Sequence, residues 1–502
     1  MSEGILPSAA PAAPLKRRRA ATLAGRVFSA AGAISAAGVA VRLVALAAAP
    51  LLTRALGPVP FGTAALIGTI ASLLAGAGAL GLDFSYTRFA LAEAGDEARA
   101  VERFCWRSAL LLGCVASGLG AAVWALVAAP HTAADPRLAP LVAGFVLLTV
   151  LTTLSQARAR MRGEYLRLAL AVLVTGVVST GGTVALALAG WRTAFALVLG
   201  TVAGLAAGVA IAGVPSPADL ARPSGLEAER RRAVVALGLP NALTTLLYWV
   251  MTSFDRWAIA WYLPAPVLGS YSFAATLAMV GLMLNSGMML VWFPEAVRSY
   301  EAGDSPAVLG RLWARLVAVL AIAWLAVVMA GGDLLRLLTD ARFHDGAAYI
   351  PWVAGGVFFY GLAQMSATAM VLRKNQAPQA AWWVVGTLVF IAANVVLVPR
   401  LGAVAAAAAG CLSFALIAAG VLWVSERWLP LQVPWLRLLA ALGAVLAAGL
   451  AGMPAWMPTP LASLAVKLPA GIAVAALVLA WVAPDWARRA ALAVRGRFRA
   501  GS

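Results

Sequence analysis

Long apolar stretches recur along the whole chain and are separated by short polar segments. Each stretch has 19 to 27 residues, and a membrane-spanning helix needs about 20 apolar residues. The pattern predicts an all-α polytopic membrane protein with about 14 transmembrane helices. We expect these spans near 27–50, 61–83, 105–129, 138–157, 168–189, 194–213, 233–254, 267–293, 312–330, 350–372, 380–398, 402–424, 435–456 and 460–483.

The composition excludes the other broad classes of protein. Of the 502 residues, 63% are hydrophobic and only 12% are charged, whereas about 25% of the residues in an average soluble domain are charged. Disordered chains are polar and rich in charge, so the same numbers exclude disorder. The three cysteines and two histidines have no metal-ligand spacing and form no disulfide framework. No cofactor and no metal are therefore expected.

The basic residues alternate between the two sides of the predicted membrane. Lys and Arg number 38 against 20 Asp and Glu, a formal net charge of +18. If the N-terminus is cytoplasmic, 29 of the 38 basic residues fall in cytoplasmic segments and 7 in external ones. This bias predicts cytoplasmic N- and C-termini and an even number of spans. It also explains the charge without nucleic acid, which we do not expect as a partner. A signal peptide cleaved near Ala49 is the competing interpretation of the N-terminal region.

An internal repeat relates the two halves of the chain. Leu52–Leu66 and Ala258–Phe273 both contain a short proline turn followed by a bulky residue and glycine, and a shift of 207 residues places Gly62 on Gly269. The pattern predicts two six-helix lobes related by a pseudo-twofold axis along the membrane normal, with two extra C-terminal helices. Two such lobes favour a transporter. The expected units are a disordered basic cytoplasmic tail (1–25), an N-lobe (26–213), a cytoplasmic linker (214–232), a C-lobe (233–424), spans 13 and 14 (425–483) and a basic cytoplasmic tail (484–502).

Short motifs follow one another in a fixed order between Arg26 and Trp428. They are an Arg-x-Leu-Gly-Pro turn within Leu51–Phe89, Leu239-Pro240, Asp255-Arg256, Leu268-Gly269-Ser270-Tyr271 and the segment Asn394–Gly410. This series resembles the polysaccharide-repeat-unit, or O-antigen-type, flippases of the multidrug/oligosaccharidyl-lipid/polysaccharide exporter superfamily. Ala405 stands where that family usually has glycine.

The resemblance implies a function, a location and partners. The function is translocation of an undecaprenyl-diphosphate-linked oligosaccharide across the bacterial cytoplasmic (inner) membrane by alternating access, without enzymatic chemistry. The partners are the polyprenyl-diphosphate-linked glycan and membrane lipids, with polysaccharide-assembly proteins as further candidates.

Arg42 is the first candidate for a substrate-binding residue. It lies in the middle of the first apolar stretch, where an arginine costs about 2.5–3.5 kcal/mol on insertion scales and usually faces protein or water. The alternative is an arginine that snorkels or pairs within the bundle. Related peptidoglycan-precursor flippases resemble this chain in having a cavity arginine at the same distance before the turn, but their next cavity arginine would fall on Ala48.

Other polar residues in or beside the apolar stretches are weaker candidates. Further cavity candidates are Arg256, Asn241, Asn285, Gln364, Asn394 and Lys467, and the gate candidates are Arg54, Asp255, Asp83, Arg88, Glu295 and Arg298. Amides can bind sugar hydroxyls, although they also form hydrogen bonds between membrane helices. Opposed charges at the cytoplasmic ends of spans 2 and 8 could close an inner gate.

Two rival functions follow from the same pattern. A multidrug or cation antiporter of the same superfamily would want acidic residues within the lobes, which are few. A membrane glycan polymerase or ligase would want a large external loop, and no predicted loop exceeds about 20 residues.

Overall fold

The computed structural model describes residues 14–92, 95–132, 134–303, 305–373 and 375–485, and every element in these ranges is helical. Thirteen helices in the described ranges are long and apolar enough to cross a membrane. The predicted seventh span lies almost wholly in α10 (Ala228–Met251), which is followed at once by a short helix, α11 (Phe254–Tyr262). The predicted all-α polytopic fold is confirmed.

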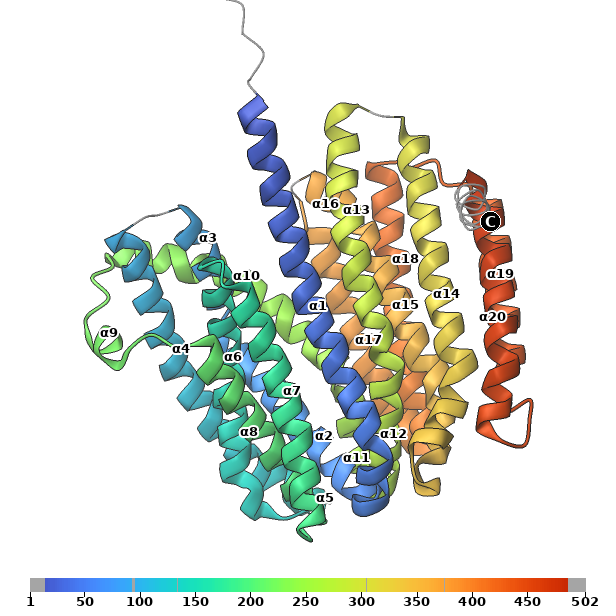
Figure 1. Cartoon of the computed structure of the whole chain (residues 1–502), viewed down its shortest axis with the longest axis horizontal. Helices are drawn as coiled ribbons and strands as arrows, with labels where there is room; N and C mark the ends of the chain where they lie inside the picture. The colour runs from blue at the N-terminus through green and yellow to red at the C-terminus, as the bar shows by residue number, and fades with distance from the viewer. Residues whose placement is uncertain (1–13, 93–94, 133, 304, 374, 486–502) are drawn as a thin grey trace, which may run out of the picture.

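The helices of the first half lie together on one side of Figure 1. They are α1 (Pro14–Leu56), α2 (Pro58–Ala79), α3 (Leu82–Ala92), α4 (Asp96–Val123), η1 (Trp124–Ala128), α5 (Ala129–Thr132), η2 (Pro136–Leu138), α6 (Ala139–Met161), α7 (Tyr165–Leu188) and α8 (Ala194–Ala212). We call this group the N-lobe. A short helix, α9 (Pro217–Ala221), lies in the connection to the second half.

The second half forms the C-lobe and a final helix pair. The C-lobe comprises α10, α11, α12 (Ala265–Ala278), η3 (Met279–Gly281), α13 (Leu282–Ala302), α14 (Pro306–Leu338), η4 (Ala341–Tyr349), α15 (Ile350–Ser366), α16 (Thr368–Leu372), α17 (Ala377–Leu401) and α18 (Ala403–Trp428). The final pair, α19 (Trp435–Gly452) and α20 (Pro460–Val482), packs against α14 at the edge of the C-lobe (Figure 1).

Small residues set the closest helix packing within the N-lobe. Gly200, Gly204 and Gly208 recur every four residues along α8 and lie on one face of the helix. A Cβ at any of the three would overlap with Thr175, Ser179 or Thr183 of α7. The hydrophobic effect does not drive helices together within a lipid bilayer. Close approach of the two backbones stabilises the pair instead, through van der Waals contacts.

The two lobes meet through the repeat-related helices α2 and α12. Gly62 of α2 lies against the backbone of Gly269, and a Cβ on Gly269 would overlap with the carbonyl group of Pro58. Beside this contact, the Trp257 indole donates a hydrogen bond of 3.0 Å to the Thr69 hydroxyl. The two glycines that the sequence repeat aligns therefore pack against each other.

The helix α10 connects the lobes at the other end of the molecule. Its first half packs on α2 and α3, where the Ser85 hydroxyl donates a 2.7 Å hydrogen bond to the Val234 carbonyl and Gly81 lies against Gly238. The following helix, α11, packs on α17 and α18 of the C-lobe. The boundary predicted at residue 233 falls within α10, and the first half of this helix packs on the N-lobe.

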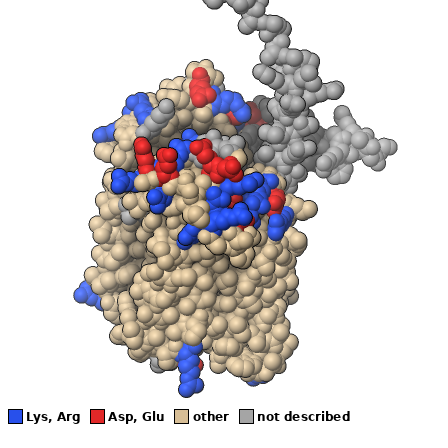
Figure 2. Space-filling model, turned by 90° about the vertical axis from the view of Figure 1, so that its left-hand side faces the viewer, with Lys and Arg blue, Asp and Glu red and all other residues tan. Residues whose placement is uncertain are grey.

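Charged side chains gather at one end of the molecule. Figure 2 shows them at one end of the N-lobe face, above a wide band of surface with few charges. We call this the basic end; the helix α3 and the start of α4 lie there (Figure 1). The turn between α1 and α2 lies at the opposite end.

Candidate functional site

Arg42 lies on the face of α1 that turns towards the C-lobe. At 100° per residue, Gly38, Arg42, Ala49 and Thr53 form one stripe along the helix. Gly38 lies beside Met283 of α13, and the Thr53 hydroxyl accepts a hydrogen bond from the Asp340 backbone N–H. The Arg42 side chain itself is exposed, and it forms no hydrogen bond or ion pair within the described part of the chain. Binding of a ligand by this exposed guanidinium stays a prediction.

The candidate amides serve helix contacts where their side chains are described. Asn285 is buried and donates 2.9 Å to the Val357 carbonyl of the neighbouring α15. Asn394 is fully buried and donates 2.8 Å to the Phe390 carbonyl of its own helix. Gln364 donates 3.4 Å to the Tyr360 hydroxyl one turn earlier. The Asn241 side chain lies outside the described residues.

Asp255 and Arg256 are buried within the C-lobe beside the break between α10 and α11. The Tyr271 hydroxyl donates a 2.5 Å hydrogen bond to Asp255 Oδ2, while the Arg256 backbone N–H donates 2.8 Å to Oδ1. The Arg256 guanidinium donates to the Thr252 carbonyl and lies 3.5 Å from Asp255 Oδ1. Both residues are thus fully engaged with their own lobe.

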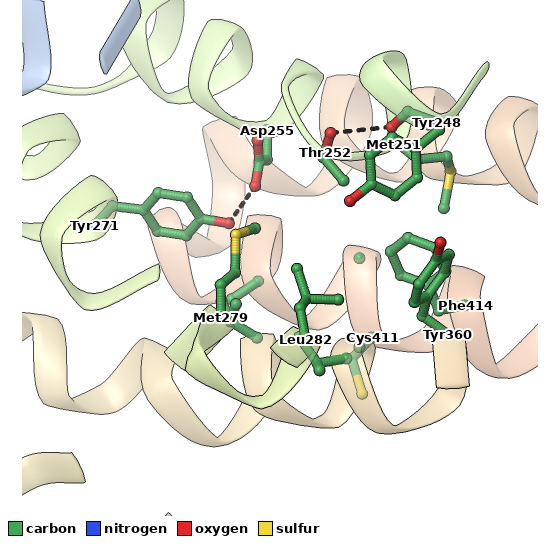
Figure 3. A pocket seen from close by; sticks show the side chains of 15 residues that line it. Tyr248, Met251, Thr252, Asp255, Tyr271, Met279, Leu282, Tyr360, Cys411 and Phe414 are labelled. Atoms are coloured by element: carbon green, nitrogen blue, oxygen red, sulfur yellow. Dashed lines mark hydrogen bonds between the residues drawn. The ribbon is translucent and has the colours of Figure 1, made fainter. Parts of the chain in front are cut away.

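A small cavity of about 50 Å³ opens beside this cluster. Asp255 and Tyr271 line one side, and the aromatic rings of Tyr248, Tyr360 and Phe414 line the other (Figure 3). The cavity lies where the C-lobe helices are interrupted, since α10 ends at Met251 and η3 interrupts the eighth span. It is far too small for a glycan.

Lys467 is buried between α20 and α14. It is 2% exposed, and its Nζ lies 2.7 Å from Asp333 Oδ2, which also accepts a 2.8 Å hydrogen bond from Ser463. Asp333 is 1% exposed, and its other oxygen lies 3.8 Å from Arg336. The structure places Lys467 in a buried ion pair that joins α20 to α14, and its predicted role in binding a lipid head group stays a prediction.

The residues predicted to close an inner gate are not brought together. Glu295 forms a 2.6 Å ion pair with Arg298 of its own helix, and both side chains are well exposed. Asp83 and Arg88 form no ion pair within the described residues. An exposed pair three residues apart on one helix contributes about 0–1 kcal/mol and links nothing across the lobes.

Arg54 lies near the end of α1, at the end of the molecule opposite the basic end. Its side chain is exposed, and its carbonyl accepts a 3.2 Å hydrogen bond from Arg342. Sequence reasoning missed both Arg342 and Asp333. The signal for Asp333 was an acid one helical turn before Arg336, directly after a predicted span ending at residue 330.

Comparisons with known proteins agree with this architecture. Residues 28–299 match the model of a family described as polysaccharide biosynthesis protein. A comparison with curated proteins finds no match. Among solved structures, the fold is similar to an inward closed lipid II flippase MurJ, with a TM-score of 0.71 and 12% identity over 90% of this chain and 99% of that one. It is also similar to an inward-facing multidrug resistance MATE family transporter of the MOP superfamily, with a TM-score of 0.59 and 14% identity over 78% and 95% of the two chains.

Proposed function

Because the chain belongs to the family of polysaccharide biosynthesis proteins, we propose that it moves a polyprenyl-diphosphate-linked oligosaccharide across the bacterial cytoplasmic membrane by alternating access. The observation that carries the proposal is the exposed, unpaired Arg42 guanidinium in the middle of a membrane helix, on the face turned towards the second lobe. The basic end would face the cytoplasm, in keeping with the 29-to-7 distribution of basic residues.

The chemistry of Arg42 suits a diphosphate. A guanidinium presents several N–H donors in a fixed plane and binds phosphate oxygens in a bidentate manner. In an apolar setting this attraction is much stronger than in water. An arginine left unpaired at this depth is costly, so a ligand that pairs with it offsets the cost. The polyprenyl chain would remain in the bilayer while the charged head crosses between the lobes.

The contacts between the lobes suit an interface that opens and closes. Around Gly62 and Gly269, the lobes touch through backbone atoms and uncharged side chains. Such contacts can separate without leaving a buried charge exposed to hydrocarbon. Sequence duplication of the two contacting helices further supports rocking of one lobe against the other.

A multidrug or cation antiporter is the nearest rival, since MATE transporters share this fold. An organic cation would be recognised by carboxylates. In this chain Asp255 is engaged with Tyr271 and Arg256, and Asp333 with Lys467. The available charge on the inter-lobe face is positive, and this favours an anionic head group.

Equilibrium binding with Arg42 variants tests the proposal. The probe is a fluorescent polyprenyl diphosphate in nanodiscs, compared with the corresponding monophosphate. We expect Arg42→Ala to weaken diphosphate binding at least about tenfold, the loss of one charge-assisted contact, and Arg42→Lys to retain part of it. Arg400→Ala is the matched control, because Arg400 is an exposed arginine at the end of α17. Unchanged diphosphate binding in Arg42→Ala would contradict the assignment.

A further inference from the structure

The short helix η4, which connects α14 to α15, begins with a turn that directs an arginine towards the other lobe. Asp340 Oδ1 accepts hydrogen bonds from the backbone N–H of Arg342 at 3.1 Å and from its Nε at 2.8 Å. These two hydrogen bonds hold the pKa of Asp340 below its ordinary value, so the carboxylate stays charged at neutral pH. The pair fixes both the turn and the direction of the Arg342 side chain.

Arg342 reaches the end of α1. Its Nη2 donates 3.2 Å to the carbonyl of Arg54, one of the last carbonyls of α1, which have no partner within the helix. A positive charge is favourable at this negative end of the helix dipole. The guanidinium also packs on Gly57, which has a φ of +74°, and a Cβ there would lie only 2.7 Å from Nη1. Gly57 is therefore needed for two reasons: the turn has a positive φ, and the Arg342 guanidinium leaves no room for a Cβ.

Neighbouring residues of the same segment strengthen the contact. The Asp340 backbone N–H donates 3.3 Å to the Thr53 hydroxyl of α1. Phe343 is fully buried, and its ring meets Phe61 of α2 edge-on at 5.5 Å and Phe273 of α12 at 5.7 Å. One short segment therefore contacts α1, α2 and α12 where the two lobes meet.

The N-lobe contains a counterpart of this turn that makes no such bridge. In η2, Asp135 accepts a 2.8 Å hydrogen bond from the backbone N–H of Arg137, the same Asp-x-Arg arrangement 205 residues earlier. The Arg137 side chain is exposed and forms no ion pair or hydrogen bond within the described part of the chain. Of these two turns, only the one in η4 directs its arginine to the other lobe.

We propose that η4 is a latch that holds the lobes together at the end opposite the basic end. Arg342 forms the hydrogen bond to α1 on which the latch depends. The inference rests on the proposed alternating access, in which this end must open to release the glycan. Opening would exchange the Arg342–Arg54 and Asp340–Thr53 hydrogen bonds for water and uncover the Phe343 ring. The latch thus sets the balance between the closed and open states of this end.

Distance measurements between spin labels test the latch without any substrate. The labels are placed at positions 192 and 401. Position 192 lies in the connection between α7 and α8, and position 401 is the last residue of α17; both are exposed. Cys105 and Cys411 are buried, so only Cys114 needs replacement. We expect Arg342→Gln to raise the ratio of open to closed distances about tenfold, the effect of losing one hydrogen bond from a charged donor. Arg137→Gln, the matched control, should leave the distribution unchanged.

The outcomes separate the latch from the proposed function. An Arg342→Gln distribution equal to that of the unmodified protein would overturn the latch. If this variant does not fold, Thr53→Val decides in the same way, because it removes the acceptor of the Asp340 N–H. A shifted distribution in a protein that translocates no lipid-linked glycan would uphold the latch and refute the transport proposal.

Discussion

Substitution of Lys467 by methionine should destabilise the contact between α14 and α20 by breaking a buried ion pair. Lys467 and Asp333 are 2% and 1% exposed, and the ammonium and carboxylate groups lie 2.7 Å apart. Removing one partner of such a pair costs about 3–5 kcal/mol, because the other charge is left without compensation. Ser463 remains bound to Asp333 and Arg336 lies 3.8 Å away, so we expect about 3 kcal/mol, the lower end of that range.

The double variant Asp333→Leu with Lys467→Met makes the prediction sharper. It removes both charges and fills the site with apolar groups, so stability should return to within about 1 kcal/mol of the original protein. Reversible unfolding in SDS micelles gives the free energies for a double-mutant cycle. Glu295→Gln, which breaks an exposed ion pair, is the control and should cost less than about 1 kcal/mol. A loss below 1 kcal/mol for Lys467→Met, or no recovery in the double variant, would refute the reasoning.

Three further predictions concern the lobe interface, the C-lobe cluster and pH. Gly269→Val should force the lobes apart, because even a Cβ overlaps with the Pro58 carbonyl; cross-linking between the turns at the end opposite the basic end should fall, and unchanged cross-linking would contradict the close contact. Tyr271→Phe should lower stability by about 1–3 kcal/mol, since Asp255 loses a buried hydrogen bond; a thermal midpoint equal to that of the original protein would contradict this. The lowered pKa of Asp340 means that its stabilising contribution is present above the ordinary carboxyl value of about 3.9 and is lost only as pH falls through the lowered value. The spin-label distances should therefore be the same at pH 5 and pH 7, and an opening between these values would contradict the assignment.

The hydrophobic pattern predicted most of the fold because a bilayer imposes length and composition on each span. Thirteen predicted spans correspond to helices that satisfy both conditions. The seventh predicted span corresponds to α10, which ends at Met251, and its charged neighbours Asp255 and Arg256 are buried inside the C-lobe. Hydropathy cannot anticipate this, because a buried charge depends on partners such as Tyr271 that lie on another helix.

The predicted site was less complete than the predicted fold. Arg42 could be predicted as a candidate because an arginine inside an apolar stretch is costly in hydrocarbon, and the sequence alone shows its position there. The partners of Lys467 and Arg342 lie 134 and 288 residues away, so no local pattern indicates them. Asn285 and Asn394 were open to two interpretations; Asn285 forms a hydrogen bond to a neighbouring helix, whereas Asn394 forms one only within its own helix. Whether Arg42 binds a diphosphate stays a prediction.

The most direct test of the central claim is translocation by the purified, full-length protein in proteoliposomes. A polyprenyl-diphosphate-linked oligosaccharide is placed in one leaflet, and its arrival in the other is followed by the access of a membrane-impermeant glycan-binding protein. The account predicts translocation above that of protein-free liposomes, its loss in Arg42→Ala and its retention in Arg400→Ala. Equal accessibility with and without the protein, or full activity in Arg42→Ala, would contradict it.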